Sequence, residues 1–369
     1  MSTRDFDLET RSSADRVGTH PRTAWWFQST NLQHANVRMR AAILMRSLSQ
    51  QGTEVAWFTA KEVDSYTCVI VNKRYDDDSL MQLRSFKQRG GRLVLDLCDN
   101  DFMPSSQGHK HQHRAMNARA LAAMADVIVT VSAELARIVT RECPTADRVV
   151  VIGDLPDDLS MVAAPPWRQI YNRWKLARAL ADLDRAAPPG VTRLVWFGVS
   201  GGSKQFKPRG RERFKGLSDL ARIAPTIAQL AQTHPLHVTV ISNSAEMYQS
   251  HVAPLLPSSR YIEWDPWTFD LLLRQQHIVL IPAQPNEYAA CKSDNRVVSA
   301  LRAGIAVVAD PAPSYAAYGD VIALGDMAAG LLRYLNDPAR RISDANRGQA
   351  QVLDAGHANR VLAQWIEIL

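Results

Sequence analysis

The sequence is poor in cysteine and has no long hydrophobic run. Its 369 residues include only Cys68, Cys98, Cys143 and Cys291, and no two of them form a C-x-x-C pair. This spacing excludes a disulfide framework and a thiolate zinc site, and it is typical of a reducing compartment. No apolar stretch approaches the ~20 residues that a membrane-spanning helix needs. The composition therefore predicts a globular protein without a spanning segment.

The sequence also lacks the features of secreted and nucleic-acid-binding proteins. The first 22 residues are polar and of mixed charge, without the apolar core of a signal peptide. We expect a disordered tail over 1–22 and a cytoplasmic location. The net charge of +6 favours an anionic substrate or peripheral contact with the anionic inner face of a membrane. No basic run with interleaved aromatics is present, so no nucleic-acid partner is expected.

Strand-like and helix-like segments alternate through two halves of the chain. A chain of this length favours two domains, and the alternation predicts a doubly wound parallel sheet in each, so the fold class is α/β. The expected strands are 24–28, 54–58, 68–72, 92–97, 126–131, 148–152, 194–197, 237–241, 261–264, 278–281, 305–309 and 321–324. Ligands of such sheets bind at the carboxyl ends of the strands, so we expect a cleft where two such edges face each other.

Proline-rich ends mark the segment between the halves. We therefore expect an N-terminal domain over 23–165, a linker over 166–190 and a second domain over 191–345. The last segment, 346–369, is predicted to be helical, because apolar residues recur at helical spacing. These are Val361, Leu362, Trp365, Ile366 and Leu369.

The stretch 292–309 carries the clearest local pattern. Ser293 or Asp294 can cap a helix, Gly304 can end it, and the apolar run 305–309 has the length of a buried strand. The helix would begin beside the cations Lys292 and Arg296. Its first N–H groups would then form an anion site of the kind that holds phosphate.

This block resembles the donor-binding signature of GT-B glycosyltransferases of the group 1 type. In that family a helix, a glycine and a Pro-Val-Val-Ala-like strand lie against the diphosphate of a nucleotide sugar. Lys292, Asn295 and Arg296 are similar to a Lys-x-x-Asn-Arg variant of bacterial surface-polysaccharide transferases. The resemblance implies that these three residues bind the donor, and that the C-terminal helix crosses back to the first domain.

Two more positions of the second half fit the same family. Gly198 ends an expected strand and Lys215 precedes a glycine that opens a helix. The resemblance implies that the backbone at Gly198 approaches the diphosphate and that Lys215 neutralises it. The intervening glycines match neither a P-loop nor the dinucleotide fingerprint.

The sequence departs from the family at one motif. Retaining members carry Glu-x7-Glu, whereas Cys291 and Ser299 occupy these positions and Ala306 replaces the usual proline. Glu287 lies just upstream and is a candidate to replace the donor-binding carboxylate in part. The motif's absence leaves ribose recognition open and is compatible with an inverting enzyme.

The first half carries candidates for the acceptor and for the chemistry. The resemblance implies that Asn31 and Arg38 face the acceptor, whereas the alternative is that Arg38 and Arg40 are solvated surface arginines. Asp99 follows an expected strand in a segment resembling the family's Asp-x-x-Asp. It could act as a general base, or it could belong to an Asp-Asn-Asp turn. Ser132 is expected to cap a helix and could also line the cleft, although capping alone explains it.

Alternate histidines form a further constellation. His109, His111 and His113 could share one side of an extended chain and bind a metal. Lys110 and Arg114 add positive charge beside them, so we predict an exposed loop and no metal. His111 or His113 acting as the base or touching the acceptor is a third option.

Together these patterns favour a cytoplasmic glycosyltransferase. It would transfer a sugar from a nucleotide-diphosphate donor to a glycan or lipid-linked acceptor. Lys215, Lys292 and Arg296 would offset charge on the leaving diphosphate, so no metal or other cofactor is expected. The alternatives are a catalytically silent nucleotide- or sugar-binding protein and a nucleotide-sugar epimerase or phosphorylase of the same shape.

Overall fold

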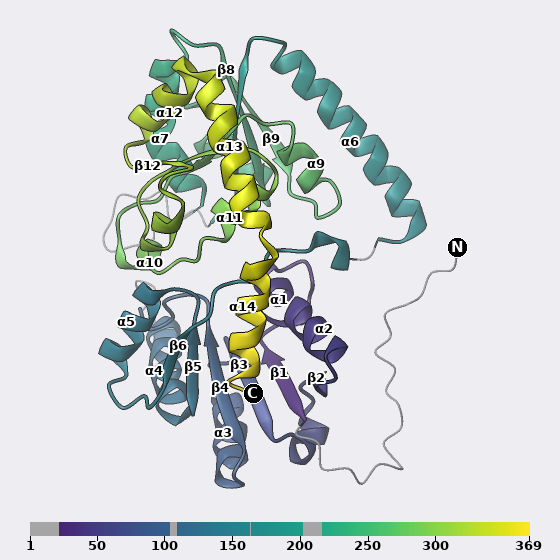
Figure 1. Cartoon of the computed structure of the whole chain (residues 1–369), viewed down its shortest axis with the longest axis vertical. Coiled ribbons are helices and arrows are strands. Elements are labelled where there is room, and N and C mark those ends of the chain that lie inside the picture. The colour runs from purple at the N-terminus through teal and green to yellow at the C-terminus, as the bar shows by residue number, and fades with distance from the viewer. Residues whose placement is uncertain (1–21, 104–108, 163, 202–215) are drawn as a thin grey trace.

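The protein folds into two lobes, each built around a six-stranded parallel sheet (Figure 1). The computed structural model describes residues 22–103, 109–162, 164–201 and 216–369. The expected tail lies outside these residues except for Arg22, and so does Lys215. Two separate parallel sheets with interleaved helices confirm the predicted pair of doubly wound α/β domains.

The first sheet has the strand order β2-β1-β3-β4-β5-β6, and every neighbouring pair is parallel. Its strands are β1 (Thr23–Phe27), β2 (Val55–Trp57), β3 (Cys68–Asn72), β4 (Arg92–Leu97), β5 (Val127–Thr130) and β6 (Val149–Val151). Its helices are α1 (Ala35–Val37), α2 (Ile43–Gln50), α3 (Asp77–Gln88), α4 (His109–Met124) and α5 (Ala133–Glu142), with a π-helical turn (Arg38–Ala42) between α1 and α2.

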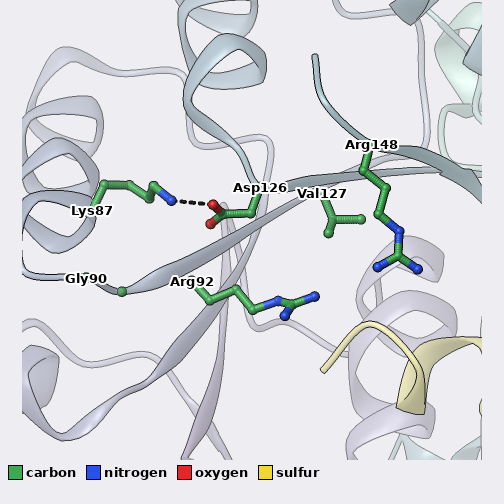
Figure 2. A pocket seen from close by; sticks show the side chains of 7 residues that line it. Lys87, Gly90, Arg92, Asp126, Val127 and Arg148 are labelled. Atoms are coloured by element: carbon green, nitrogen blue, oxygen red, sulfur yellow. Dashed lines mark hydrogen bonds and ion pairs between the residues drawn. The ribbon is translucent and has the colours of Figure 1, made fainter.

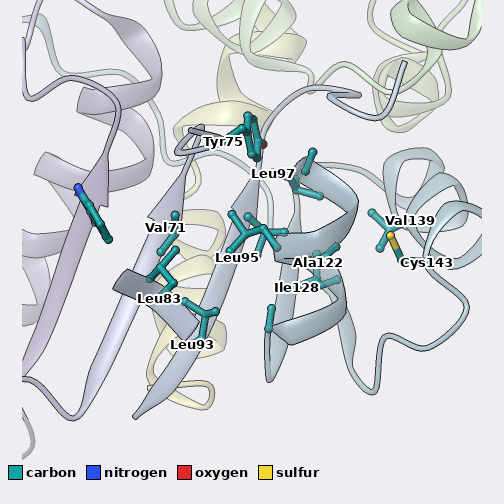
Figure 3. Packing of buried hydrophobic residues seen from close by; sticks show 14 of the residues in the cluster. Val71, Tyr75, Leu83, Leu93, Leu95, Leu97, Ala122, Ile128, Val139 and Cys143 are labelled. Atoms are coloured by element: carbon teal, nitrogen blue, oxygen red, sulfur yellow. The ribbon is translucent and has the colours of Figure 1, made fainter. Parts of the chain in front are cut away.

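The central strands of this sheet are mostly apolar because helices cover both faces, and Asn72 and Asp96 are buried polar exceptions near their carboxyl ends. All five residues of β3 are buried. On one face Val71, Leu83 and Leu95 belong to a cluster that α3 and α4 close (Figure 3). On the other face Trp25 and Leu44 belong to a second cluster. The burial on both faces explains why these strands show continuous hydrophobic runs.

The second sheet has the order β12-β11-β10-β7-β8-β9, again parallel throughout. Its strands are β7 (Thr192–Phe197), β8 (Leu236–Ser242), β9 (Ser259–Glu263), β10 (Ile278–Ile281), β11 (Ala306–Ala309) and β12 (Ala323–Leu324). Its helices include α7 (Leu217–Leu230), α8 (Ala245–His251), α9 (Phe269–Leu273), α10 (Glu287–Ala290), α11 (Asn295–Arg302), α12 (Met327–Asn336) and α13 (Pro338–Leu353). This is the dinucleotide-fold order, in which the direction of winding reverses between β7 and β10.

The segment expected to be a linker contains a long helix, α6 (Pro166–Ala186). Ala179 of α6 packs into the core of the second lobe. Asp182 forms an ion pair with Arg260 of β9. In Figure 1, α6 runs along the outer edge of the second lobe.

The chain ends on the first lobe. Helix α14 (Ala355–Ile366) follows α13 and descends onto the lower lobe, shown in yellow in Figure 1. Val361, Trp365 and Ile368 are buried in the cluster that contains Trp25 and Leu44 of the first domain. In the described part of the chain, no helix combines the length and the apolar character that crossing a bilayer requires.

Candidate active site

The segments at the carboxyl ends of the two sheets meet, and hydrogen bonds join them. Ser132 Oγ donates to the carbonyl oxygen of Cys291 at 2.9 Å, and Ser293 Oγ donates to Asp154 Oδ2 at 2.6 Å. Ser132 also caps α5, as predicted, by accepting from the N–H of Leu135 at 3.2 Å. We call this region the interdomain junction. It is the part of doubly wound sheets where ligands bind.

Arg296 lies at the point where the second sheet reverses its winding. Its Cζ atom is 5.4 Å from the ring centre of Trp196 and 5.3 Å from that of Phe197, both at the end of β7. A Cβ atom on Gly198 would lie 3.3 Å from the Trp196 indole and 4.0 Å from Arg296 Cζ. Gly198 therefore permits the close packing of this arginine against the end of the strand.

Two nitrogen atoms of the Arg296 guanidinium lack a hydrogen-bond partner in the described part of the chain. These are Nε and Nη2, and both are buried. Burial lowers the pKa of Arg296, and the negative ends of Tyr315 and Asp219 counteract this only in part. A buried cation without a bound carboxylate costs free energy, and an anionic ligand would repay this cost.

Arg296 belongs to the first turn of α11. Asp294 is the N-cap residue, but its side chain does not cap the helix, and it accepts from the Tyr318 hydroxyl at 2.7 Å. Ser293 donates to Asp154 instead. The prediction that Ser293 or Asp294 caps this helix was therefore wrong. Asn295 opens the helix and Gly304 follows its end with φ +74°, as predicted. An uncapped helix start attracts anions.

Asp219 is the carboxylate whose charge acts on Arg296. It is buried on α7, and its Oδ1 accepts from the backbone N–H of Gln284 at 3.2 Å. Burial raises the pKa of Asp219 to about 6, although this hydrogen bond and Arg296 act in the opposite direction. Asp219 is therefore a weak counter-ion for Arg296. The sequence analysis did not identify it, because its neighbours resemble an ordinary helix start.

Asp99 joins the two lobes. Lys73 Nζ donates to its Oδ2 at 2.6 Å, and Lys292 Nζ donates to its Oδ1 across the junction. The hydroxyl of Tyr288 donates to the same Oδ1 at 3.3 Å and accepts from Lys292 Nζ at 2.9 Å. Burial would raise the pKa of Asp99, but Lys292 and Lys73 together hold it well below its usual range. With both lysines in contact, this carboxylate accepts a proton poorly.

Lys73 is a site residue that the sequence analysis missed. It follows β3, next to the point between β1 and β3 where the first sheet reverses its winding. Among the described residues other than glycine, it alone has a positive φ, of 58°. Such strain is concentrated at functional sites. A basic residue directly after a buried strand was the available signal.

The candidates on the acceptor side have different surroundings. Asn31 is exposed, and its side chain accepts from the backbone N–H of Gln33 at 2.9 Å. Arg38 is 1% exposed and forms a bidentate pair with Asp157 at 2.7 and 2.6 Å. The alternative of solvated arginines was wrong, because Arg40 is also buried and paired with Asp96. Arg38 has its donors occupied and holds Asp157 in place.

Glu287 contacts the opposite lobe. Its carboxylate forms an ion pair with Arg141 of α5, including a 3.0 Å bond to Nη2. The pKa of Glu287 is lowered chiefly by this hydrogen bond. To bind the donor, the Glu287 carboxylate would have to accept hydrogen bonds from the donor in addition to those from Arg141.

The histidines do not form an exposed loop, and that prediction was wrong. Residues 109–113 make up the first turn of α4. His113 Nε2 lies 3.4 Å from Asp77 Oδ1, and its side chain is about half exposed. The side chains of His109 and His111 lie outside the described part of the structure. Among the described residues, no group of three or more His, Cys, Asp or Glu side chains is arranged to hold a metal.

A hollow of about 400 Å³ lies at the opposite edge of the first sheet (Figure 2). Arg92 and Val127 are the first residues of β4 and β5, so this edge is the amino end of the strands. Lys87 and Asp126 form an ion pair there, and Arg148 also lines the hollow. It is not part of the interdomain junction.

Solved structures share this architecture over nearly the whole chain. HepE from Anabaena, in complex with UDP and glucose, is 14% identical with a TM-score of 0.59, and the match covers 94% of this chain and 99% of that one. Sucrose-phosphate synthase from Thermosynechococcus elongatus is 13% identical with a TM-score of 0.62, covering 95% and 98%. A UDP-forming trehalose-phosphate synthase from Burkholderia xenovorans is 13% identical with a TM-score of 0.52, covering 82% and 72%.

These similarities confirm the GT-B architecture expected from the sequence. At identities this low, the likeness concerns the fold and leaves the substrates to be argued from the site. No family model matches the sequence, and no curated protein does.

Proposed function

We propose that the protein is a glycosyltransferase that uses a nucleotide-diphosphate sugar. The observation that carries this proposal is the unsatisfied guanidinium of Arg296 at the winding reversal of the second sheet. It belongs to the first turn of α11, whose start is uncapped, and it packs against Trp196 and Phe197. A diphosphate would satisfy the arginine and the helix N–H groups together.

Cations would also carry the electrostatic part of the reaction. Negative charge builds on the diphosphate as it leaves the sugar, and Arg296 and Lys292 would offset it. Lys215 precedes Gly216 at the start of α7 and would add a third cation. With three protein cations in place, the proposed reaction needs no metal ion. Asn295, as the first residue of α11, would bind the donor next to them.

Asp99 would accept the proton of the acceptor hydroxyl. The acceptor oxygen then forms a bond to the anomeric carbon, while the bond from that carbon to the diphosphate oxygen breaks and the nucleoside diphosphate leaves. Lys292 now pairs with Asp99 across the junction. A donor diphosphate would compete for Lys292. When Lys292 moves from Asp99 to the diphosphate, the basicity of Asp99 would rise. This mechanism inverts the sugar, in accord with the missing Glu-x7-Glu.

The acceptor would be a glycan or a lipid-linked sugar bound on the side of the first lobe. Asn31 is exposed there, and its amide oxygen accepts from the backbone N–H of Gln33. Arg38 would shape this side through Asp157. The proposed location is the cytoplasm.

A catalytically silent nucleotide-binding protein is the second candidate, because Cys291 and Ser299 replace the two carboxylates of the retaining motif. Both candidates bind a nucleoside diphosphate, but only the enzyme releases one from a nucleotide sugar. Release of UDP or GDP in the presence of glycan and lipid-linked acceptors therefore separates them.

Calorimetry with UDP and GDP tests the donor site. Arg296→Met should lower the affinity at least about tenfold, since a charge-assisted contact to phosphate is lost. Lys292→Ala should also weaken binding. Arg333→Met is the matched control, because Arg333 lies on α12 and pairs with Asp344 at 2.7 Å.

The stability of the Arg296 variant gives an independent check. A purely structural arginine would destabilise the fold when it is removed, whereas an unsatisfied buried cation should not. Unchanged nucleotide affinity together with lower thermal stability would contradict the proposed donor site.

A further inference from the structure

The outer face of α6 carries a cluster of large apolar side chains. Trp167, Ile170, Tyr171 and Trp174 are 66%, 73%, 50% and 57% exposed. They are spaced at i, i+3, i+4 and i+7, so they lie on one face of the helix. We call these four residues the α6 aromatic face.

The packing of α6 does not use this face. The buried residues of the helix are Asn172, Ala179 and Leu183, which lie on the opposite side. The rings of Tyr171 and Trp174 lie 6.1 Å apart, so the face is continuous. A contiguous exposed apolar surface of this kind marks an interaction site.

The charges around the face have one sign. Four cations and no acidic residue lie between Pro166 and Arg178. Arg173 and Arg178 are exposed, and Arg178 Cζ lies 5.6 Å from the Trp174 ring. Arg168 and Lys175 instead turn inward, toward Trp267 and Asp265. Tryptophan and tyrosine beside exposed arginines are typical of helices that lie at the headgroup level of anionic membranes.

We propose that the α6 aromatic face docks this protein onto an anionic lipid bilayer. Two observations favour a bilayer as the occupant. The exposed charges complement anionic headgroups. In addition, α6 runs along the outer edge of the second lobe, where it can approach an extended surface (Figure 1). Docking would hold the junction near a lipid-linked acceptor. This consequence rests on the proposed transferase function, whereas the docking does not.

Vesicle sedimentation tests the docking without any activity measurement. The full chain is mixed with vesicles of phosphatidylcholine alone or of phosphatidylcholine with phosphatidylglycerol. The wild type should sediment with the anionic vesicles. In the quadruple variant, Trp167→Ser, Ile170→Ser, Tyr171→Ser and Trp174→Ser remove the apolar area that would be buried in the bilayer. Its partition coefficient into anionic vesicles should therefore fall at least about tenfold.

A second variant separates charge from apolar contact. Arg173→Gln with Arg178→Gln should weaken binding to anionic vesicles by about fivefold per arginine, and should leave the weak binding to neutral vesicles unchanged. Met81→Ser is the matched control, because Met81 is 64% exposed on α3 of the other lobe. It should sediment as the wild type does. Thermal melting shows that each variant is folded.

Three results would overturn the proposal. The wild type could stay in the supernatant with both vesicle types, or the quadruple variant could sediment like the wild type. Light scattering could also show a dimer for the wild type and a monomer for the quadruple variant, which would assign the face to a second copy of the chain. If the wild type sediments with anionic vesicles but does not bind UDP, only the proposed transferase function is contradicted, and the docking stands.

Discussion

At the residue scale, the junction concentrates charge on few side chains. Asp99 receives two ammonium groups, whereas the nearby guanidinium of Arg296 has unsatisfied nitrogens. The two cations contributed by the 292–296 segment thus have opposite surroundings. Lys292 is held by the first lobe and Arg296 is available to a ligand. Asp99 thus links the two lobes through Lys73 and Lys292, and it is also the base of the proposed reaction.

Asp99→Asn should reduce turnover about 10²–10⁴-fold, because an amide of the same shape cannot accept the acceptor's proton. Donor affinity should be unchanged or higher, since Lys292 no longer has a carboxylate competing for it. Steady-state kinetics together with calorimetry would measure both quantities.

The control for this variant is Asp126→Asn. Asp126 is ion-paired with Lys87 at the far edge of the same sheet, so its loss should leave turnover intact. If Asp99→Asn keeps near-normal turnover, Asp99 serves only to link the lobes, and His113 becomes the next base to examine.

Asp219 gives a prediction for pH. Its folded pKa of about 6 lies above the unfolded value of about 3.9, so its contribution to stability is fully present below about pH 4 and is lost as pH rises through about 6. Asp219→Asn cannot ionise. Its stability relative to wild type should therefore rise between these pH values, by no more than about 3 kcal/mol.

Urea denaturation at about pH 4 and about pH 8 would measure this difference. Glu263→Gln, at an exposed carboxylate of β9 in the same lobe, is the matched substitution for comparison. A pH-independent difference for Asp219→Asn would mean that Asp219 is ionised throughout, as a full counter-ion of Arg296.

Single residues were the hardest features to predict. Ser132 caps α5, as the sequence after its strand indicated, and its hydroxyl also reaches Cys291 of the other lobe. Lys73 was missed because its importance comes from a partner 26 positions away in sequence, Asp99. The roles of Ser293 and Asp294 were misassigned for the same reason. Their partners, Asp154 and Tyr318, are brought close only by the fold.

At the element scale, prediction was far more successful, since buried parallel strands have an unmistakable apolar signature. The segment 305–309 was expected as a strand, and β11 spans Ala306–Ala309. The start of α4 was not expected, because three histidines and a lysine have little helical signal of their own. The helix there continues an apolar face that becomes evident only further along, at Ala118 and Leu121.

Gly216 directly precedes α7, and its conformation gives a further prediction. It has a φ of +80°, and a Cβ atom there would lie 2.3 Å from the Val199 carbonyl oxygen. Gly216→Ala should therefore destabilise the protein by more than about 2 kcal/mol, through backbone strain and a clash that only backbone movement can relieve.

The control is Gly190→Ala. Gly190 has a φ of +94°, but nothing lies within 4 Å of the added Cβ atom, so only the strain of about 1–2 kcal/mol applies. Chemical denaturation would compare the two. Equal losses would show that the turn at Gly216 adjusts freely to a side chain.

At the scale of the whole molecule, two lobes are held in one arrangement by contacts far apart in sequence. Lys292, Glu287 and Cys291 each bond to the first lobe, from one short segment of the second. Helix α14 adds a further connection between the lobes, because the chain leaves α13 on the second lobe and α14 packs on the first sheet. The apolar spacing of this helix was evident in the sequence. The pairing of Arg141 with Glu287 was not, because neither residue belongs to a periodic pattern.

Trp365 is the anchor of the connection through α14. It is 1% exposed, and Arg40 Cζ lies 5.4 Å from its ring centre, above the buried Arg40–Asp96 pair. Trp365→Ala should cost about 3–5 kcal/mol, from lost apolar burial and from the cavity left behind. Ile366→Ala is the matched control, since the neighbouring side chain is 47% exposed and should change stability by less than about 0.5 kcal/mol. Urea denaturation would measure both.

Trp365 lies on the first lobe, whereas the proposed UDP site lies on the second lobe. UDP affinity should therefore be unchanged in the folded Trp365→Ala protein. A loss of UDP binding as large as that of Arg296→Met would instead show that the connection through α14 sets the geometry of the donor site.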